Sequence, residues 1–146
     1  MIDLWTVVRF LHIVGAIIWV GGQLTVTVVL LPIAQKELGL TDRANLLRGV
    51  GKLFARITAV VFLPLQIGTG LLLAVHSGVT WASLLEPGYG RILVAKVLLF
   101  ALVMAAATAH GIFQARREPR AARAASLSAL VGSLGVVLLA TMLVGG

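Results

Sequence analysis

Three histidines stand within or beside long apolar runs of the chain. They are His12, His76 and His110, and the 146 residues contain no others. Placing an ionisable side chain in hydrocarbon costs about 2.5 to 3.5 kcal/mol on insertion scales, so each needs a reason to be there. Neutral imidazoles on facing helices can hold a b-type haem inside a helix bundle, and they also bind copper or zinc. The three histidines are therefore candidate haem or metal ligands.

Helical spacing places each histidine on a stripe with other polar side chains. The first stripe contains Arg9, His12, Ala16, Trp19 and Gln23. The second contains Gln66, Thr69, Leu73 and His76, and the third, repeating every seven residues, contains Tyr89, Lys96, Val103, His110 and Arg117. Three such faces indicate three helices that present polar groups to one another.

Depth along the expected helices separates the histidines. His12 lies about 12 Å into the first helix, and Lys96 about 9 Å into the third from the same side, at about 1.5 Å per residue. His76 ends the second helix on that side. His110 follows Lys96 by 14 residues, about 21 Å further in. We predict that His12 and His76 form a ligand pair near the outer leaflet, and that His110 is a separate candidate ligand near the inner one.

Positive and aromatic side chains are expected around this pair. Arg9, Arg91 and Lys96 would pair with haem propionates or another anion. Trp19, on the stripe of His12, is counted with the cofactor-binding residues. Each residue also has a structural reading, because membrane histidines hydrogen-bond neighbouring helices and lysines extend toward the interface. No methionine, the soft ligand expected for copper(I), lies on these stripes at this depth, so haem is favoured over copper.

The composition requires helices that cross a membrane. Apolar residues make up 60% of the chain, charged residues 12%, and the mean hydropathy is +1.06, which excludes a soluble enzyme. We predict one all-α transmembrane domain over 1–146, an integral membrane four-helix up-down bundle. The expected spans are 4–33, 54–76, 91–113 and 124–144, with an interfacial helix over 41–53. Pro32 is expected to end the first span and Pro64 to kink the second. Gly49 and Gly51 allow a bend after the interfacial helix.

The basic residues predict the orientation. Nine lie in two connections: Lys36, Arg43, Arg48, Lys52 and Arg56 in the first, and Arg116, Arg117, Arg120 and Arg123 in the second. Only Arg9, Arg91 and Lys96 lie on the other side. The positive-inside rule then predicts cytoplasmic connections and places both termini on the outer face of the inner (plasma) membrane. The basic residues of these connections account for the net charge of +7. No nucleic acid is therefore expected as a partner.

The acidic residues and the missing cysteines exclude several kinds of chemistry. All five acids lie in connections or at span ends, namely Asp3, Glu37, Asp42, Glu86 and Glu118, which argues against a carboxylate-based proton pump or antiporter. The absence of cysteine excludes disulfides, c-type haem attachment, iron–sulfur clusters and thiolate zinc sites. No Walker loop, GxGxxG sequence or nucleophile elbow occurs.

Three segments resemble a known family. The run LHIVGAIIWVGG (11–22) resembles the opening of the membrane domain of the CopD family, which is linked to copper resistance. The runs FARITAVVFLPLQIGTGLLLA (54–74) and YGRILVAKVLLF (89–100) resemble its second and third spans. The outline of Trp5, His12, Trp19, Lys96 and His110 also resembles HemJ-type protoporphyrinogen oxidases, which are small haem proteins. Both resemblances imply His12 and Lys96 as site residues and are compatible with haem.

Three functions follow as expectations. The first is a CopD-like membrane protein that binds haem b or copper in the outer half of the bundle, for electron transfer or metal handling. The second is a HemJ-like oxidase, which would make any enzymatic activity that of a haem-dependent oxidoreductase. The third is a cofactor-free subunit whose small-residue faces (Ala105–Ala107, Gly132 and Gly135) pack against a larger membrane complex. The expected partners are the lipid bilayer and either a second copy of the chain or that complex.

Overall fold

The computed structural model describes residues 3–144, and within that range every long element is a helix and no strand occurs. Four helical stretches are long and apolar enough to cross a membrane: Leu4–Glu37, Leu40–His76, Tyr89–Ala115 and Pro119–Met142. The predicted all-α fold with four long apolar helices is confirmed. Residues 1–2 and 145–146, the chain ends whose side of the membrane the sequence predicts, lie outside the described range. The chain divides into two compact units, Met1–Ser77 and Gly78–Gly146.

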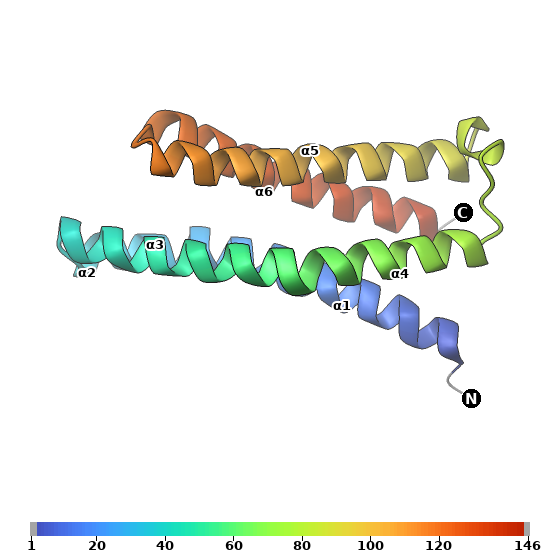
Figure 1. The fold of residues 1–146 in the computed structure, drawn as a ribbon, viewed down its shortest axis with the longest axis horizontal. Coiled ribbons are helices and arrows are strands. Elements are labelled where there is room, and N and C mark those ends of the chain that lie inside the picture. Colours follow the sequence, from blue (N-terminus) through green and yellow to red (C-terminus); the bar gives the residue numbers. More distant parts are fainter. Residues whose placement is uncertain (1–2, 145–146) are drawn as a thin grey trace. The chain divides into compact units, whose positions relative to one another are not determined.

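The first unit is a hairpin of two long helical stretches that run antiparallel (Figure 1). One stretch consists of α1 (Leu4–Leu24), the π-helical segment η1 (Thr25–Leu30) and α2 (Leu31–Glu37). The other consists of α3 (Leu40–Ile57), the π-helical segment η2 (Thr58–Phe62) and α4 (Leu63–His76). Contacts between α1 and α4 and between α2 and α3 hold the two stretches together.

Both prolines of this hairpin lie two residues after a π-helical segment. Pro32 follows η1 and Pro64 follows η2. A proline has no N–H to donate, and its ring collides with the carbonyl four residues earlier. A π turn inserts one extra residue, and here the N–H of Leu31 reaches back five residues to Val26. The prediction that Pro32 ends the first helix is therefore wrong, because the helix continues through it to Glu37.

The segment 41–53, in the first connection, is continuous with the second span. The sequence predicts an interfacial helix there that runs into this span, and Gly49 and Gly51 allow a bend between the two. In the structure α3 is helical from Leu40 to Ile57 and continues through η2 into α4. Glycine permits a bend but does not require one, and the flanking leucines, lysine and arginines are good helix formers.

The second unit is a tighter hairpin of α5 (Tyr89–Ala115) and α6 (Pro119–Val144), preceded by the short 3₁₀ helix η3 (Ser83–Leu85). A Cβ atom on Gly132 would lie 2.5 Å from Cγ2 of Val103, and one on Gly135 would lie 3.0 Å from Cδ2 of Leu99. Gly132 and Gly135 thus admit a close neighbour, as predicted. That neighbour is α5 of the same chain.

Most large apolar side chains in both units point outward. Only 6 to 17% of the residues in the most apolar window of each long stretch are buried. Exposed leucines, isoleucines and valines follow every stretch, among them Ile17, Val60, Leu71, Leu102 and Val131. Water tolerates contiguous apolar surface on this scale poorly, whereas the hydrocarbon core of a bilayer matches it. The arrangement is that of helices with lipid-facing surfaces.

Candidate functional site

The polar contact between α1 and α4 is centred on His12. Its Nδ1 lies 2.7 Å from Oγ1 of Thr69, one of the buried polar residues of α4. The ring also lies against Gly70, where a Cβ would approach its Cε1 to 3.3 Å. A glycine at position 70 therefore lets the imidazole sit directly on the backbone of α4.

The hydrogen bonds around Thr69 determine which nitrogen of His12 carries the proton. The hydroxyl of Thr69 has one hydrogen, which it donates to the backbone carbonyl of Leu65. Towards His12 the same oxygen can only accept, so Nδ1–H of His12 is the donor and Nε2 carries the ring lone pair. Metal-ligating histidines have this arrangement, in which one nitrogen donates to a fixed acceptor and the other coordinates. The Thr69 contact is the feature that analysis of the sequence missed, although Thr69 was placed on the correct face.

His76 makes a different contact from the one predicted. Its ring stacks on Trp5 with ring centroids 3.8 Å apart and an interplanar angle of 11°. His76 follows Thr69 by seven residues, and His12 follows Trp5 by seven, so the two histidines lie at levels about 10 Å apart along the hairpin. The structure thus brings His12 to Thr69 and His76 to Trp5, and it does not bring the two imidazoles to one point.

Trp19, seven residues after His12 on α1, contacts the other stretch of the hairpin at η2. Its Nε1–H donates to Oγ1 of Thr58 at 3.1 Å, and its ring stacks on Phe62 with centroids 4.8 Å apart. Thr58 and Phe62 are the first and last residues of η2, so Trp19 contacts both ends of the π-helical segment. Trp19 is buried among these side chains, which gives it a packing role at a different level from His12.

Gln66 lies between the levels of His12 and Trp19. Its side chain is packed against Gly15, and the residue is only 8% exposed. Among the described residues its Oε1 has no hydrogen-bond partner. A buried acceptor without a donor is costly, by about 1 to 3 kcal/mol, and such groups commonly accept from an ordered water or a ligand. The sequence predicted an interhelical hydrogen bond for Gln66 rather than an orphaned oxygen.

In the second unit, His110 is fixed in the same way as His12. Its Nδ1 lies 2.8 Å from the backbone carbonyl of Ala122 at the start of α6. A carbonyl only accepts, so Nδ1 is again the protonated nitrogen and Nε2 carries the lone pair. Both histidines are thus held by short contacts that select the tautomer used for coordination through Nε2.

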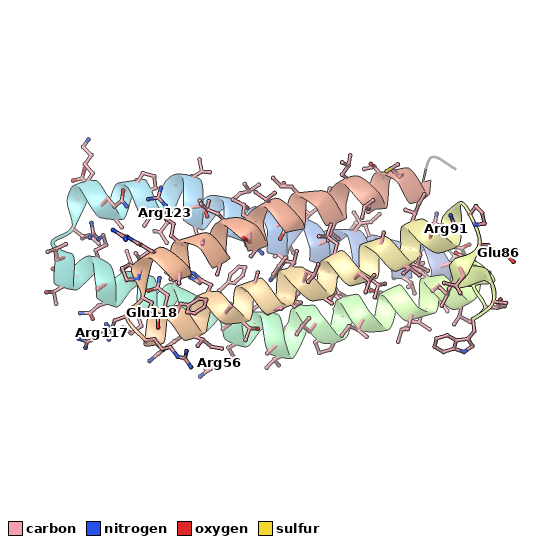
Figure 2. The ribbon with its side chains drawn as sticks, turned by 90° about the horizontal axis from the view of Figure 1, so that it is seen from above. Arg56, Glu86, Arg91, Arg117, Glu118 and Arg123 are labelled. Atoms are coloured by element: carbon pink, nitrogen blue, oxygen red, sulfur yellow. The ribbon has the colours of Figure 1, made fainter. Side chains whose placement is uncertain are left out.

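The predicted cationic residues have separate surroundings. Arg9 is exposed on α1, one helical turn before His12. Arg91 is exposed near the start of α5, and its Nε–H donates to the backbone carbonyl of Leu85 at 3.2 Å. Figure 2 shows Arg91 at the end of the hairpin that carries η3. Lys96, further along α5, is partly buried.

His12 and His110 each offer a single coordinating nitrogen, Nε2. Within residues 3–144 no group of three or more histidine, cysteine, aspartate or glutamate side chains is arranged to hold a metal ion. A protein-only metal cage needs such a group, whereas a haem iron needs only one imidazole with a fixed tautomer at an axial position. Comparisons with protein-family models, with curated proteins and with solved structures find no significant match. The resemblances to the CopD and HemJ families stay predictions.

Proposed function

We propose that the chain is a multi-pass membrane protein in which Nε2 of His12 coordinates the iron of haem b, for electron transfer, with a copper ion as the alternative occupant. The observation that supports this proposal is the chain of hydrogen bonds from Nδ1–H of His12 to Thr69 and from Thr69 to the carbonyl of Leu65. It fixes the ring and leaves Nε2 as the basic nitrogen, and a donor on the opposite nitrogen also raises the basicity of a metal-binding imidazole.

The proposed topology is a four-helix up-down bundle in the inner (plasma) membrane, with both termini outside. Four helices of sufficient length and apolarity support the membrane location. The excess of nine basic residues over three supports the orientation. In this topology His12 lies in the outer half of the membrane, and the exposed guanidinium of Arg9, one turn further out, is suited to the carboxylates of a haem.

Haem b, when bound, supplies an iron that takes up and releases one electron. The chain's own residues orient the ring of His12 and are proposed to exclude water from the site. Thr69 holds the His12 ring against α4, and the glycine at position 70 lets it lie close to the helix. The surrounding apolar side chains keep water from the site and so affect the reduction potential.

An absorption spectrum of the detergent-purified protein, oxidised and dithionite-reduced, tests the proposal when iron and copper are measured in the same sample. A reduced b-type α-band with near-stoichiometric iron is expected. Bound copper without a Soret band would move the proposal to metal handling, and the absence of both metals would contradict it. His76→Ala then tests the predicted second ligand, since a ligand change shifts the Soret and α-bands.

The structure removes part of the support for the third expected function, a cofactor-free subunit of a larger membrane complex. Its small-residue face was expected to receive a partner at Gly132 and Gly135. Both glycines contact Val103 and Leu99 within the second unit, so that part of the face is already used. The alanines of α5 (Ala105–Ala107) remain a partly exposed surface.

A further inference from the structure

Three basic residues form a stripe on α3 that neither the haem proposal nor the hairpin uses. Arg48, Lys52 and Arg56 follow one another at intervals of four residues, and all three are exposed. Successive members of the stripe are about 6 Å apart along the helix axis and only about 40° apart around it. We refer to these three residues as the basic stripe.

The basic stripe faces away from the rest of the hairpin. Phe54 marks the packed side of α3, because its ring lies against Gly22 and stacks with Trp19. At about 100° per residue, Lys52 and Arg56 are each rotated about 160° from Phe54. The labelled side chain of Arg56 points outward from the ribbon in Figure 2. The stripe is therefore open to whatever surrounds the first unit.

The charges of the basic stripe are not neutralised within the described structure. The ion pair formed among residues 3–144 joins Lys36 to Glu37. No acidic residue lies three or four positions from any member of the stripe, where it would form a pair along the helix. Three like charges at this spacing repel one another, so an external anion would stabilise them.

The length of the helical stretch places the stripe at the level of lipid headgroups. His76 ends the stretch on the outer side, and Arg56 lies 20 residues before it, about 30 Å away, which is the thickness of the hydrocarbon core. Lys52 lies at about 36 Å, within the headgroup layer on the other side, and Arg48 lies at about 42 Å, just beyond that layer and within reach of it for a long side chain. The stripe therefore runs through the headgroup layer of one leaflet.

Apolar side chains continue the same surface toward the hydrocarbon. Leu53 is 60% exposed and Ile57 is 47% exposed, and each follows a member of the stripe by one residue. Val60 is also exposed, one turn after Arg56. A ligand with an anionic head and an apolar tail matches both parts of this surface, whereas a free anion matches only the cations.

We propose that the basic stripe binds the phosphate groups of an anionic phospholipid in the cytoplasmic leaflet, with its acyl chains along Ile57 and Val60. The planar guanidinium groups of Arg48 and Arg56 suit bidentate contacts with phosphate, and Lys52 adds a point charge between them. This inference rests on the membrane-crossing part of the proposed function and not on haem binding. A basic residue near an anionic lipid surface changes binding by about fivefold.

Native mass spectrometry of the full chain, released from detergent with equal amounts of phosphatidylglycerol and phosphatidylcholine of the same chain length, tests the proposal. The wild type should retain phosphatidylglycerol preferentially, by about one hundredfold if each of the three stripe residues contributes about fivefold. The triple variant R48Q/K52Q/R56Q should lose that preference. The control R116Q/R120Q/R123Q removes the same charge from exposed residues of the second unit, and should keep it.

Several results would overturn the proposal. They are no lipid preference in the wild type, a preference retained by the stripe variant, or an equal loss in both triple variants, which would indicate only a general effect of net charge. Displacement of the lipid by inorganic phosphate would identify a free-phosphate site instead. Circular dichroism checks that both variants keep the wild-type helix content. The absorption spectrum of each sample distinguishes failure of one proposal from failure of the other. A lipid preference without a Soret band would contradict the haem proposal and leave the lipid proposal standing.

Discussion

The second unit packs its two helices mainly through glycines, with one polar contact from His110 to the carbonyl of Ala122, whereas the first unit adds several side-chain hydrogen bonds and stacked rings to its glycine contacts. Gly132 and Gly135 allow Val103 and Leu99 to approach α6, and Val103 is only 2% exposed. In the first unit the corresponding contacts are made by His12 with Thr69 and by Trp19 with Thr58. Two hairpins of apolar helices are thus held together by different chemistry.

The two kinds of helix contact have different energetic costs in a membrane. Close contact of small residues is sufficient to associate apolar helices in lipid, because it gains dispersion energy without burying polar groups. The first unit instead keeps a histidine, two threonines and an orphaned glutamine oxygen between its helices. Polar groups of this kind are costly in hydrocarbon. The proposed haem site is placed in the first unit for this reason.

The largest expected effect on stability concerns the glycine contact. Gly132→Ala would place a Cβ 2.5 Å from Cγ2 of Val103, which is buried and stiff, so we expect the variant to be destabilised by about 1 to 3 kcal/mol. Gly111→Ala is the control, because its Cβ would meet nothing within 4 Å and alanine favours helix. Thermal unfolding in detergent measures both. Equal effects, or no rescue of Gly132→Ala by Val103→Ala, would refute the account of the second unit.

A smaller effect is expected at the polar contact of the first unit. Thr69→Val removes the acceptor of Nδ1–H of His12 and should destabilise the protein by about 1 kcal/mol. Thr108→Val is the control, since the Thr108 hydroxyl donates only to Met104 in its own helix. Nitrogen-15 NMR of the histidines should show His12 protonated at Nδ1 in the wild type and a changed tautomer distribution in Thr69→Val. An unchanged His12 spectrum would remove Thr69 from the site.

Substitution of Trp19 by phenylalanine leaves an aromatic ring beside Phe62 but removes the hydrogen bond to Thr58 and part of the buried ring. We expect Trp19→Phe to destabilise the protein by at least about 0.6 kcal/mol, the average measured for such bonds between membrane helices, with the lost packing added to it. Trp81, which is 91% exposed, supplies the control Trp81→Phe, with no change in stability expected. Urea or thermal unfolding distinguishes the two. Indistinguishable variants would show that the hydrogen bond does not stabilise the hairpin.

The smallest effect is expected at the beginning of α1. Asp3 accepts from the backbone N–H of Thr6 at 2.7 Å, and hydrogen bonding by Thr6 lowers the pKa of its carboxyl below the ordinary 3.8. Because the pKa is lower in the folded state, the carboxylate stabilises the helix start above about pH 3.8, and this is lost as the pH falls through the lowered pKa. Amide exchange of Thr6 should therefore accelerate at acid pH and in Asp3→Ala. The start of α5 at Gly88 has no side-chain cap and serves as the comparison; equal acceleration there would contradict the capping role.

The sequence was sufficient to predict the helices but not all of their ends. Four runs of high hydropathy predict four long helices because each residue contributes independently to the pattern. The continuation past Pro32 could not be predicted in this way, since a proline usually ends a helix and the π turn that accommodates it has no distinct sequence pattern.

The sequence was sufficient to predict which residues share a helix face. It was not sufficient to predict which residues of two facing helices contact each other. The stripes containing His12 and Thr69 were identified, and the structure places these two residues in contact. The expected pairing of His12 with His76 needed the relative register of two helices, and a single sequence carries no direct information on register. His76 is found stacked on Trp5 instead. The two histidines differ by seven residues in level, which is about two helical turns.

The most direct test of the central claim compares His12→Ala with His110→Ala. Both rings are held through Nδ1, His12 by the hydroxyl of Thr69 on α4 and His110 by the backbone carbonyl of Ala122 on α6. We predict that the reduced-minus-oxidised spectrum of His12→Ala loses the b-type α-band and the bound iron, while His110→Ala keeps the band assigned to His12. A full-intensity band with unchanged iron content in His12→Ala would contradict the account.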